Sequence, residues 1–116
     1  MMIEKKTNIV VTLQYEAVHN WPECPFKEVD FLRHPHRHIF FMKCKKEVSH
    51  SDRDVEIIML KREIEKHLDI EYKGNFGSKS CEMIAESLAD LFGLNYCSVL
   101  EDNENGAEVI INKKNI

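Results

Sequence analysis

The sequence predicts an α+β fold in which a four-stranded antiparallel sheet carries two helices on one face. Apolar residues alternate with polar ones over residues 8–18 and 36–48, which is typical of half-buried strands. Apolar residues recur every three or four positions in the middle of the chain, which is typical of amphipathic helices. An Asn-Gly pair between two short apolar runs near the end indicates a hairpin. The predicted order of elements is therefore ββααββ.

The first half of this order follows from the strand pattern and from prolines. After the strand over residues 8–18, residues 19–33 contain Pro22 and Pro25, whose fixed φ and missing donors favour a loop. The second strand covers residues 36–48. A helix then follows, because its apolar residues form one stripe: Ile57, Leu60, Ile64 and Leu68.

The second half depends on caps and turns. Residues 69–79 contain two glycines and are predicted as a loop. Ser80 is a suitable N-cap for a second helix, which ends at Gly93. Strands over residues 97–101 and 107–112 flank the Asn-Gly turn.

Composition limits the class of protein. The 116 residues are long enough for one domain, spanning residues 1–116, with a net charge of -4, which argues against nonspecific nucleic-acid binding. The cysteines show no metal-knuckle spacing, so we expect them to be reduced. No apolar segment is long enough for a membrane span and none resembles a leader, so we expect a cytoplasmic protein without a membrane partner.

Histidines gather where the second strand begins. In His34-Pro35-His36-Arg37-His38, side chains two residues apart point to one face of a strand. His19 ends the first strand and can add a ligand from the adjacent strand. Three imidazoles with one open position form a common catalytic zinc site, so we predict Zn2+ on His19, His34 and His36. His38 is the reserve ligand if His19 is remote.

A sheet covered on one face only leaves its other face and both edges open. Closing several copies edge to edge into a barrel removes the edges and places sites between subunits. We therefore expect a symmetric homo-oligomer.

The order of elements and the motifs together resemble the 6-pyruvoyl-tetrahydropterin synthase and 6-carboxytetrahydropterin synthase group of tunnelling-fold proteins. The resemblance covers nearly the whole chain and rests on five motifs in order: His19 at the end of Tyr15–His19, His34-Pro35-His36, the stretch Met59–Asp69, the helix start Ser80-Cys81-Glu82, and Glu101 in Ser98–Asp102.

The resemblance implies a zinc-dependent enzyme acting on 7,8-dihydroneopterin triphosphate or a related pterin, assembled as a trimer or a pair of stacked trimers. It assigns Glu101 to anchor the ring, because one carboxylate can accept two adjacent N–H donors. It places Cys81 and Glu82 beside the substrate.

Three readings of the chemistry remain open, and they differ in the catalytic base. In the first, Cys24 reaches the site from its proline-bounded loop. In the second, Asp30 or Glu28 replaces the cysteine, as in relatives that cleave the pterin side chain. The family's Asp-His pair is represented by Asp69 alone, since Ile70 follows it. In the third, the protein binds metal and a pterin or purine ring without turnover.

Overall fold

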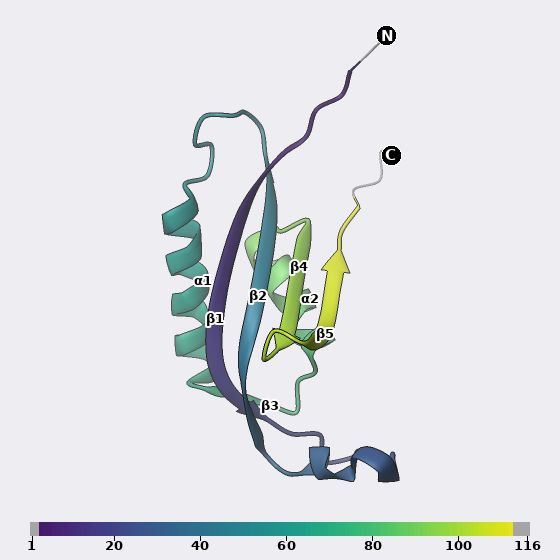
Figure 1. Cartoon of the computed structure of the whole chain (residues 1–116). Helices are drawn as coiled ribbons and strands as arrows, with labels where there is room; N and C mark the ends of the chain where they lie inside the picture. Colours follow the sequence, from purple (N-terminus) through teal and green to yellow (C-terminus); the bar gives the residue numbers. More distant parts are fainter. Residues whose placement is uncertain (1–2, 113–116) are drawn as a thin grey trace.

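Alternation of apolar and polar side chains produces two long, paired strands. The computed structural model describes residues 3–112, and in it β1 (Thr7–His19) and β2 (His36–Val48) run antiparallel along their whole length (Figure 1). Thr7 lies opposite Val48, and His19 lies opposite His36. The last residue of β1 therefore lies beside the first residue of β2, at the end of the sheet where the histidines were predicted.

The sheet has five strands in the order β3-β1-β2-β4-β5. β4 (Tyr96–Glu101) pairs antiparallel with β2, and β5 (Asn105–Ile110) pairs antiparallel with β4. The α+β class is confirmed, but the predicted four-stranded antiparallel sheet is not, because β3 (Asn75–Gly77) pairs parallel with the end of β1 and makes the sheet mixed. We predicted this segment as a loop, since three residues are too few to show an alternating pattern. Within the described residues the sheet does not close on itself.

Capped helices cover one face of the sheet. α1 (Ile57–Tyr72) begins after Glu56, whose carboxylate accepts the backbone N–H groups of Ile58 and Met59. α2 (Cys81–Phe92) begins after Ser80, whose hydroxyl accepts the Met83 N–H, and it ends at Gly93 with φ of 61°.

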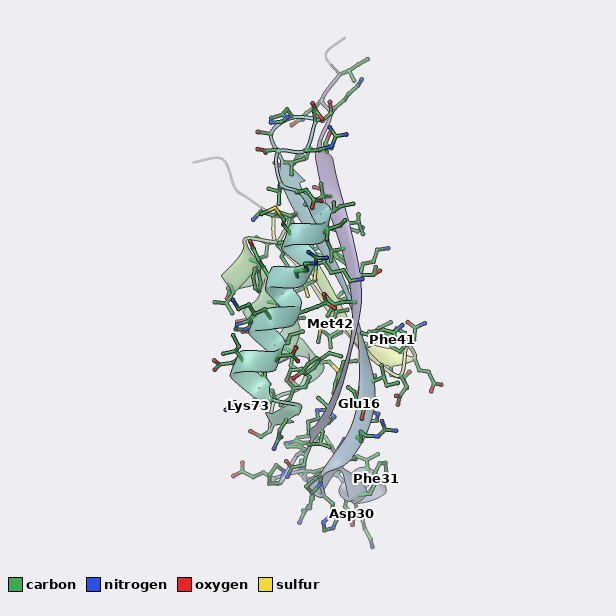
Figure 2. All side chains as sticks on the ribbon, turned by 90° about the vertical axis from the view of Figure 1, so that its left-hand side faces the viewer. Glu16, Asp30, Phe31, Phe41, Met42 and Lys73 are labelled. Atoms are coloured by element: carbon green, nitrogen blue, oxygen red, sulfur yellow. The ribbon has the colours of Figure 1, made fainter. Side chains whose placement is uncertain are left out.

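The core lies between these helices and the sheet. Residues that alternate onto the covered face of the strands pack with the buried stripes of both helices; the set includes Val11, Leu13, Phe40, Met42, Leu60, Ile64, Leu68, Ile84, Leu88 and Val99. Figure 2 shows Met42 on the helix side of β2 and Phe41 on the opposite side. The same alternation carries two of the histidines onto the helix side.

The turn between β4 and β5 differs from the predicted Asn-Gly turn. Its central residues are Asp102 and Asn103, with φ of 54° and 60°, and the Glu104 N–H donates to the Glu101 carbonyl. Asn105 and Gly106 instead belong to β5. Gly106 is required there because a Cβ would lie 1.9 Å from the Val99 carbonyl oxygen.

The loop between β1 and β2 contains a short 3-10 helix, η1 (Lys27–Arg33), at the end of the molecule where Asp30 and Phe31 are labelled in Figure 2. Over residues 3–112, no helix combines the length and the apolar character that a membrane crossing requires.

Candidate metal centre

Four side chains converge at the end of the covered face of the sheet: His19, His36, His38 and Glu101. One ligand atom from each lies within 4.8 Å of every other, so the group can hold a metal ion. His19 ends β1 opposite His36, and His38 follows two residues later on the same face of β2. Glu101 ends β4 opposite Phe40, which places its carboxylate beside the imidazoles. Strand register therefore brings together residues that lie far apart in the sequence.

Each imidazole is held through its Nδ1 atom. His19 Nδ1 lies 3.1 Å from the Lys79 carbonyl oxygen, and His36 Nδ1 lies 2.9 Å from the His34 carbonyl oxygen. His38 Nδ1 lies 2.7 Å from Asp102 Oδ2. Because carbonyls and carboxylates only accept hydrogen bonds, Nδ1 carries the proton in each ring. In the neutral ring, Nε2 then presents a lone pair, which is the arrangement found in metal-ligating histidines.

Two of the three Nε2 atoms have no hydrogen-bond partner among the described residues. Among the described residues, Nε2 of His19 and Nε2 of His36 are buried and make no hydrogen bond. His19 Nε2 lies 2.8 Å from Glu101 Oε2, but this contact lacks the direction of a hydrogen bond. His38 Nε2 lies 3.7 Å from Glu101 Oε1. Buried nitrogens without partners are costly, and lone pairs facing a carboxylate repel, so a cation bound by the three imidazoles would satisfy the nitrogens and attract the carboxylate.

The donor set fits a divalent metal without selecting one. Imidazole suits zinc, copper, iron and nickel, and a carboxylate can complete the site for several of them. The ring centroids of His19 and His36 are 4.5 Å apart, and His19 also packs edge-on against Phe40 at 5.2 Å, so the apolar core closes one side of the group.

A pocket of about 520 Å³ adjoins the centre. Its lining includes His19, His36 and Glu101, the first turn of α2, and Trp21. Small polar molecules fit such a volume. A second hollow, of about 530 Å³, is lined largely by the middle of β1 and β2 and contains none of the predicted site residues.

The start of α2 places two predicted residues in this pocket. Cys81 and Glu82 both line it; Cys81 is buried and Glu82 is exposed. Burial, followed by the charges of Glu101 and Glu82, raises the pKa of the Cys81 thiol to about 12. The thiol therefore stays protonated, so it is poorly suited to act as a base.

The structure does not bring His34 into the cluster. Its side chain is exposed, and it precedes the first residue of β2, so the pair on the covered face is His36 and His38. His34 contributes its backbone carbonyl, which holds the His36 ring. His38, predicted only as the reserve, occupies the third position of the cluster alongside His19.

The predicted catalytic residues lie outside the pocket lining. Cys24 is fully buried, and its thiol faces the carbonyls of Phe26 and Val29 at 3.6 and 3.7 Å within its own loop. Asp30 is exposed in η1, as is Glu28, and Asp69 is exposed in the last turn of α1. None of these four residues lines the pocket beside the histidines.

Sequence reasoning missed Asp102. Its backbone N–H donates to the Ile39 carbonyl at 2.8 Å, and its Oδ1 accepts the Ile39 N–H at 3.0 Å. The hydrogen bond from His38, followed by that from Ile39, lowers the pKa of Asp102 below its ordinary value. The available signal was an acidic residue directly after β4, the strand that pairs with β2. This signal points to His38 only once the register of the two strands is known.

No model of a known protein family matches this chain, and no curated protein matches it either.

Proposed function

We propose that this chain is a zinc protein that binds a pterin-like molecule in the pocket beside His19, His36 and His38. The observation that carries the proposal is the convergence of three Nε2 atoms whose Nδ1 atoms are already engaged. This arrangement orients the rings before any ion binds, and three imidazoles are a common ligand set of catalytic zinc.

The ring-binding part of the proposal rests on Glu101 and on the resemblance to the 6-pyruvoyl- and 6-carboxytetrahydropterin synthases. Glu101 borders both the histidines and the pocket, so its carboxylate can face a ring that offers paired N–H donors. The His-x-His motif of that family then falls on His36-Arg37-His38, in place of the predicted His34-Pro35-His36.

A bound zinc ion would supply Lewis acidity to oxygen atoms of the pocket ligand. Around it, Cys81 and Glu101 line the same pocket, and the Cys81 thiol stays protonated. Glu82 is the exposed carboxylate that lines the pocket from α2, so it is positioned to exchange protons with the ligand. Trp21 lines the pocket from the β1–β2 loop.

A second candidate function, binding of metal and ring without turnover, is favoured by one observation. Cys24, Asp30 and Asp69, the residues that the resemblance offers for proton transfer, do not line the pocket. Incubating the zinc-loaded protein with 7,8-dihydroneopterin triphosphate and analysing the mixture by mass spectrometry separates the two candidates. A new pterin product that disappears in Glu82→Gln supports the enzyme, and unchanged substrate that co-purifies with the protein supports the binding protein.

Ring recognition is tested by calorimetry with neopterin. Glu101→Gln replaces one acceptor by a donor and removes the charge, so we expect affinity to fall by about thirty- to a thousandfold, or roughly 2–4 kcal/mol. Glu104→Gln removes a charge from the adjacent turn, where the side chain is exposed, and should leave affinity unchanged. Equal affinity of the parent and Glu101→Gln, or no binding by the parent, means that the pocket serves another ligand.

A further inference from the structure

Among the described residues, Asp102 is the one charged group that accepts a hydrogen bond from the Nδ1 atom of a cluster histidine. His19 and His36 are held by backbone carbonyls, whereas His38 is held by the Asp102 carboxylate at 2.7 Å. A carboxylate acceptor raises the basicity of the imidazole more than a neutral carbonyl does and thereby strengthens it as a ligand.

The backbone of Asp102 is held in an uncommon conformation for this purpose. Its φ of 54° is in the left-handed region, which costs free energy for a residue other than glycine. Three hydrogen bonds hold it: the Asp102 N–H donates to the Ile39 carbonyl, Oδ1 accepts the Ile39 N–H, and Oδ2 accepts the His38 Nδ1–H. The turn after β4 is thereby fastened to β2 at the residue that follows His38.

We propose that Asp102 is a positioning residue that fixes the Nδ1–H tautomer of His38 and so sets the affinity of the centre for its metal. The inference rests on the proposed metal centre and adds a residue that does not touch the metal. It follows from two facts. Both carboxylate oxygens of Asp102 accept hydrogen bonds, and one of the two donors, the backbone N–H of Ile39, can only donate, whereas the other, His38 Nδ1, can also become an acceptor.

This occupancy makes Asp102→Asn informative. An asparagine tolerates positive φ but offers one acceptor oxygen where the aspartate offers two. The Ile39 N–H requires that oxygen, so the side-chain NH2 group must face His38 Nδ1. The His38 ring then shifts its proton to Nε2, where it blocks the lone pair that would bind the metal.

Two measurements test the inference on the full chain. In the metal-free protein, nitrogen NMR of the histidine rings should show His38 protonated on Nδ1 in the parent and on Nε2 in Asp102→Asn. Competition titration with zinc should show about 10- to 100-fold weaker binding by the variant. Asp102→Gly, which relieves the backbone and removes both acceptor oxygens, should also bind zinc more weakly.

Glu104→Gln is the matched control, since it removes one negative charge from the same turn without a contact to the histidines. It should retain the His38 tautomer and the zinc affinity of the parent. Equal zinc affinity of the parent and both Asp102 variants, or an unchanged His38 tautomer in Asp102→Asn, would overturn the role of Asp102 alone. A parent protein that binds no zinc, cobalt or iron would overturn the proposed metal centre, and the role of Asp102 with it.

Discussion

Histidine orientation at this centre depends mainly on backbone geometry. Two of the three rings are held by carbonyl groups, so the identities of Lys79 and His34 matter less than the path of the chain through them.

Sequence patterning predicted His19 and His36, because both lie at strand ends. It predicted that the two histidines on one face of β2 are His34 and His36, whereas the structure has His36 and His38 there. The prediction began the strand too early, because the first residue of a strand is set by pairing and not by composition. Asp102 could not be predicted, since its contact with His38 depends on a turn with positive φ.

A residue away from the metal centre gives a prediction on pH dependence. Asp54 accepts hydrogen bonds from the backbone and hydroxyl of Ser49, both at 2.8 Å. These bonds, in that order, lower the pKa of Asp54 below the ordinary value of 3.8. As pH falls, the unfolded chain therefore takes up this proton first. The stabilisation by Asp54 is present above the ordinary pKa and is lost as pH falls through the lowered one.

Asp54→Asn should thus reduce the free energy of unfolding near neutral pH and should lose less of it between about pH 5 and about pH 2 than the parent does. Urea unfolding at several pH values measures this difference. Asp52→Asn, in the same loop, is the control, because the Asp52 carboxylate pairs with the exposed Arg53 alone among the described residues, and the Asp52 backbone N–H that donates to His50 Nδ1 is unchanged. Parallel pH profiles for the parent and Asp54→Asn would contradict the assignment.

Elements with strong local signals were predicted well. Both α-helices carry an apolar stripe, and the predicted cap Ser80 and stop Gly93 of α2 are observed. The elements that escaped prediction lack such signals. β3 has three residues and exists because Val18 and Asn20 donate to the carbonyls of Gly74 and Gly77. The β4–β5 turn is displaced from Asn-Gly because Asp102 and Asn103 adopt positive φ and Gly106 is used for close packing.

The close packing at Gly106 gives a prediction for the β4–β5 hairpin. In Gly106→Ala the new methyl group would meet the Val99 carbonyl oxygen at 1.9 Å and the Leu100 Cα at 2.7 Å. Both are backbone atoms, so the strands must separate. We expect the free energy of unfolding to fall by about 1–3 kcal/mol or more. Glu104→Ala, in the exposed turn, should change it by less than about 0.5 kcal/mol. Urea denaturation measures the stability of both variants. A Gly106→Ala variant as stable as the parent would contradict the close approach of Gly106 to the backbone of Val99 and Leu100.

At the scale of the whole molecule, an open sheet leaves much unpaired surface. Among the described residues, β3 pairs with β1 only near Val18 and His19, and β5 has a neighbour on one side only. Ile110 on β5 is 60% exposed, and Val10 on β1 is 47% exposed. Apolar residues beside free strand edges favour association with further copies. We therefore expect a closed homo-oligomer, and the resemblance to the tetrahydropterin synthases implies that it is a trimer or a pair of stacked trimers.

Sedimentation at micromolar concentration tests this expectation. Ile110→Lys should shift the protein towards monomer, because it places a charge at the proposed edge contact. Ile70→Lys is the matched control, since Ile70 has nearly the same exposure, 62%, but lies on α1. A monomeric parent, or equal dissociation by both variants, would contradict association through the sheet edge.

The metal content of the purified chain is the decisive measurement for the proposed zinc centre. The full chain, purified and dialysed against zinc, should hold one ion per chain, with zinc–nitrogen distances of about 2.0–2.1 Å by X-ray absorption. His36→Ala should lose this ion, whereas His34→Ala should keep it, because the carbonyl that holds the His36 ring remains. A His36→Ala variant that retains the zinc of the parent, or a His34→Ala variant that loses it as completely as His36→Ala does, would contradict the zinc centre at His19, His36 and His38.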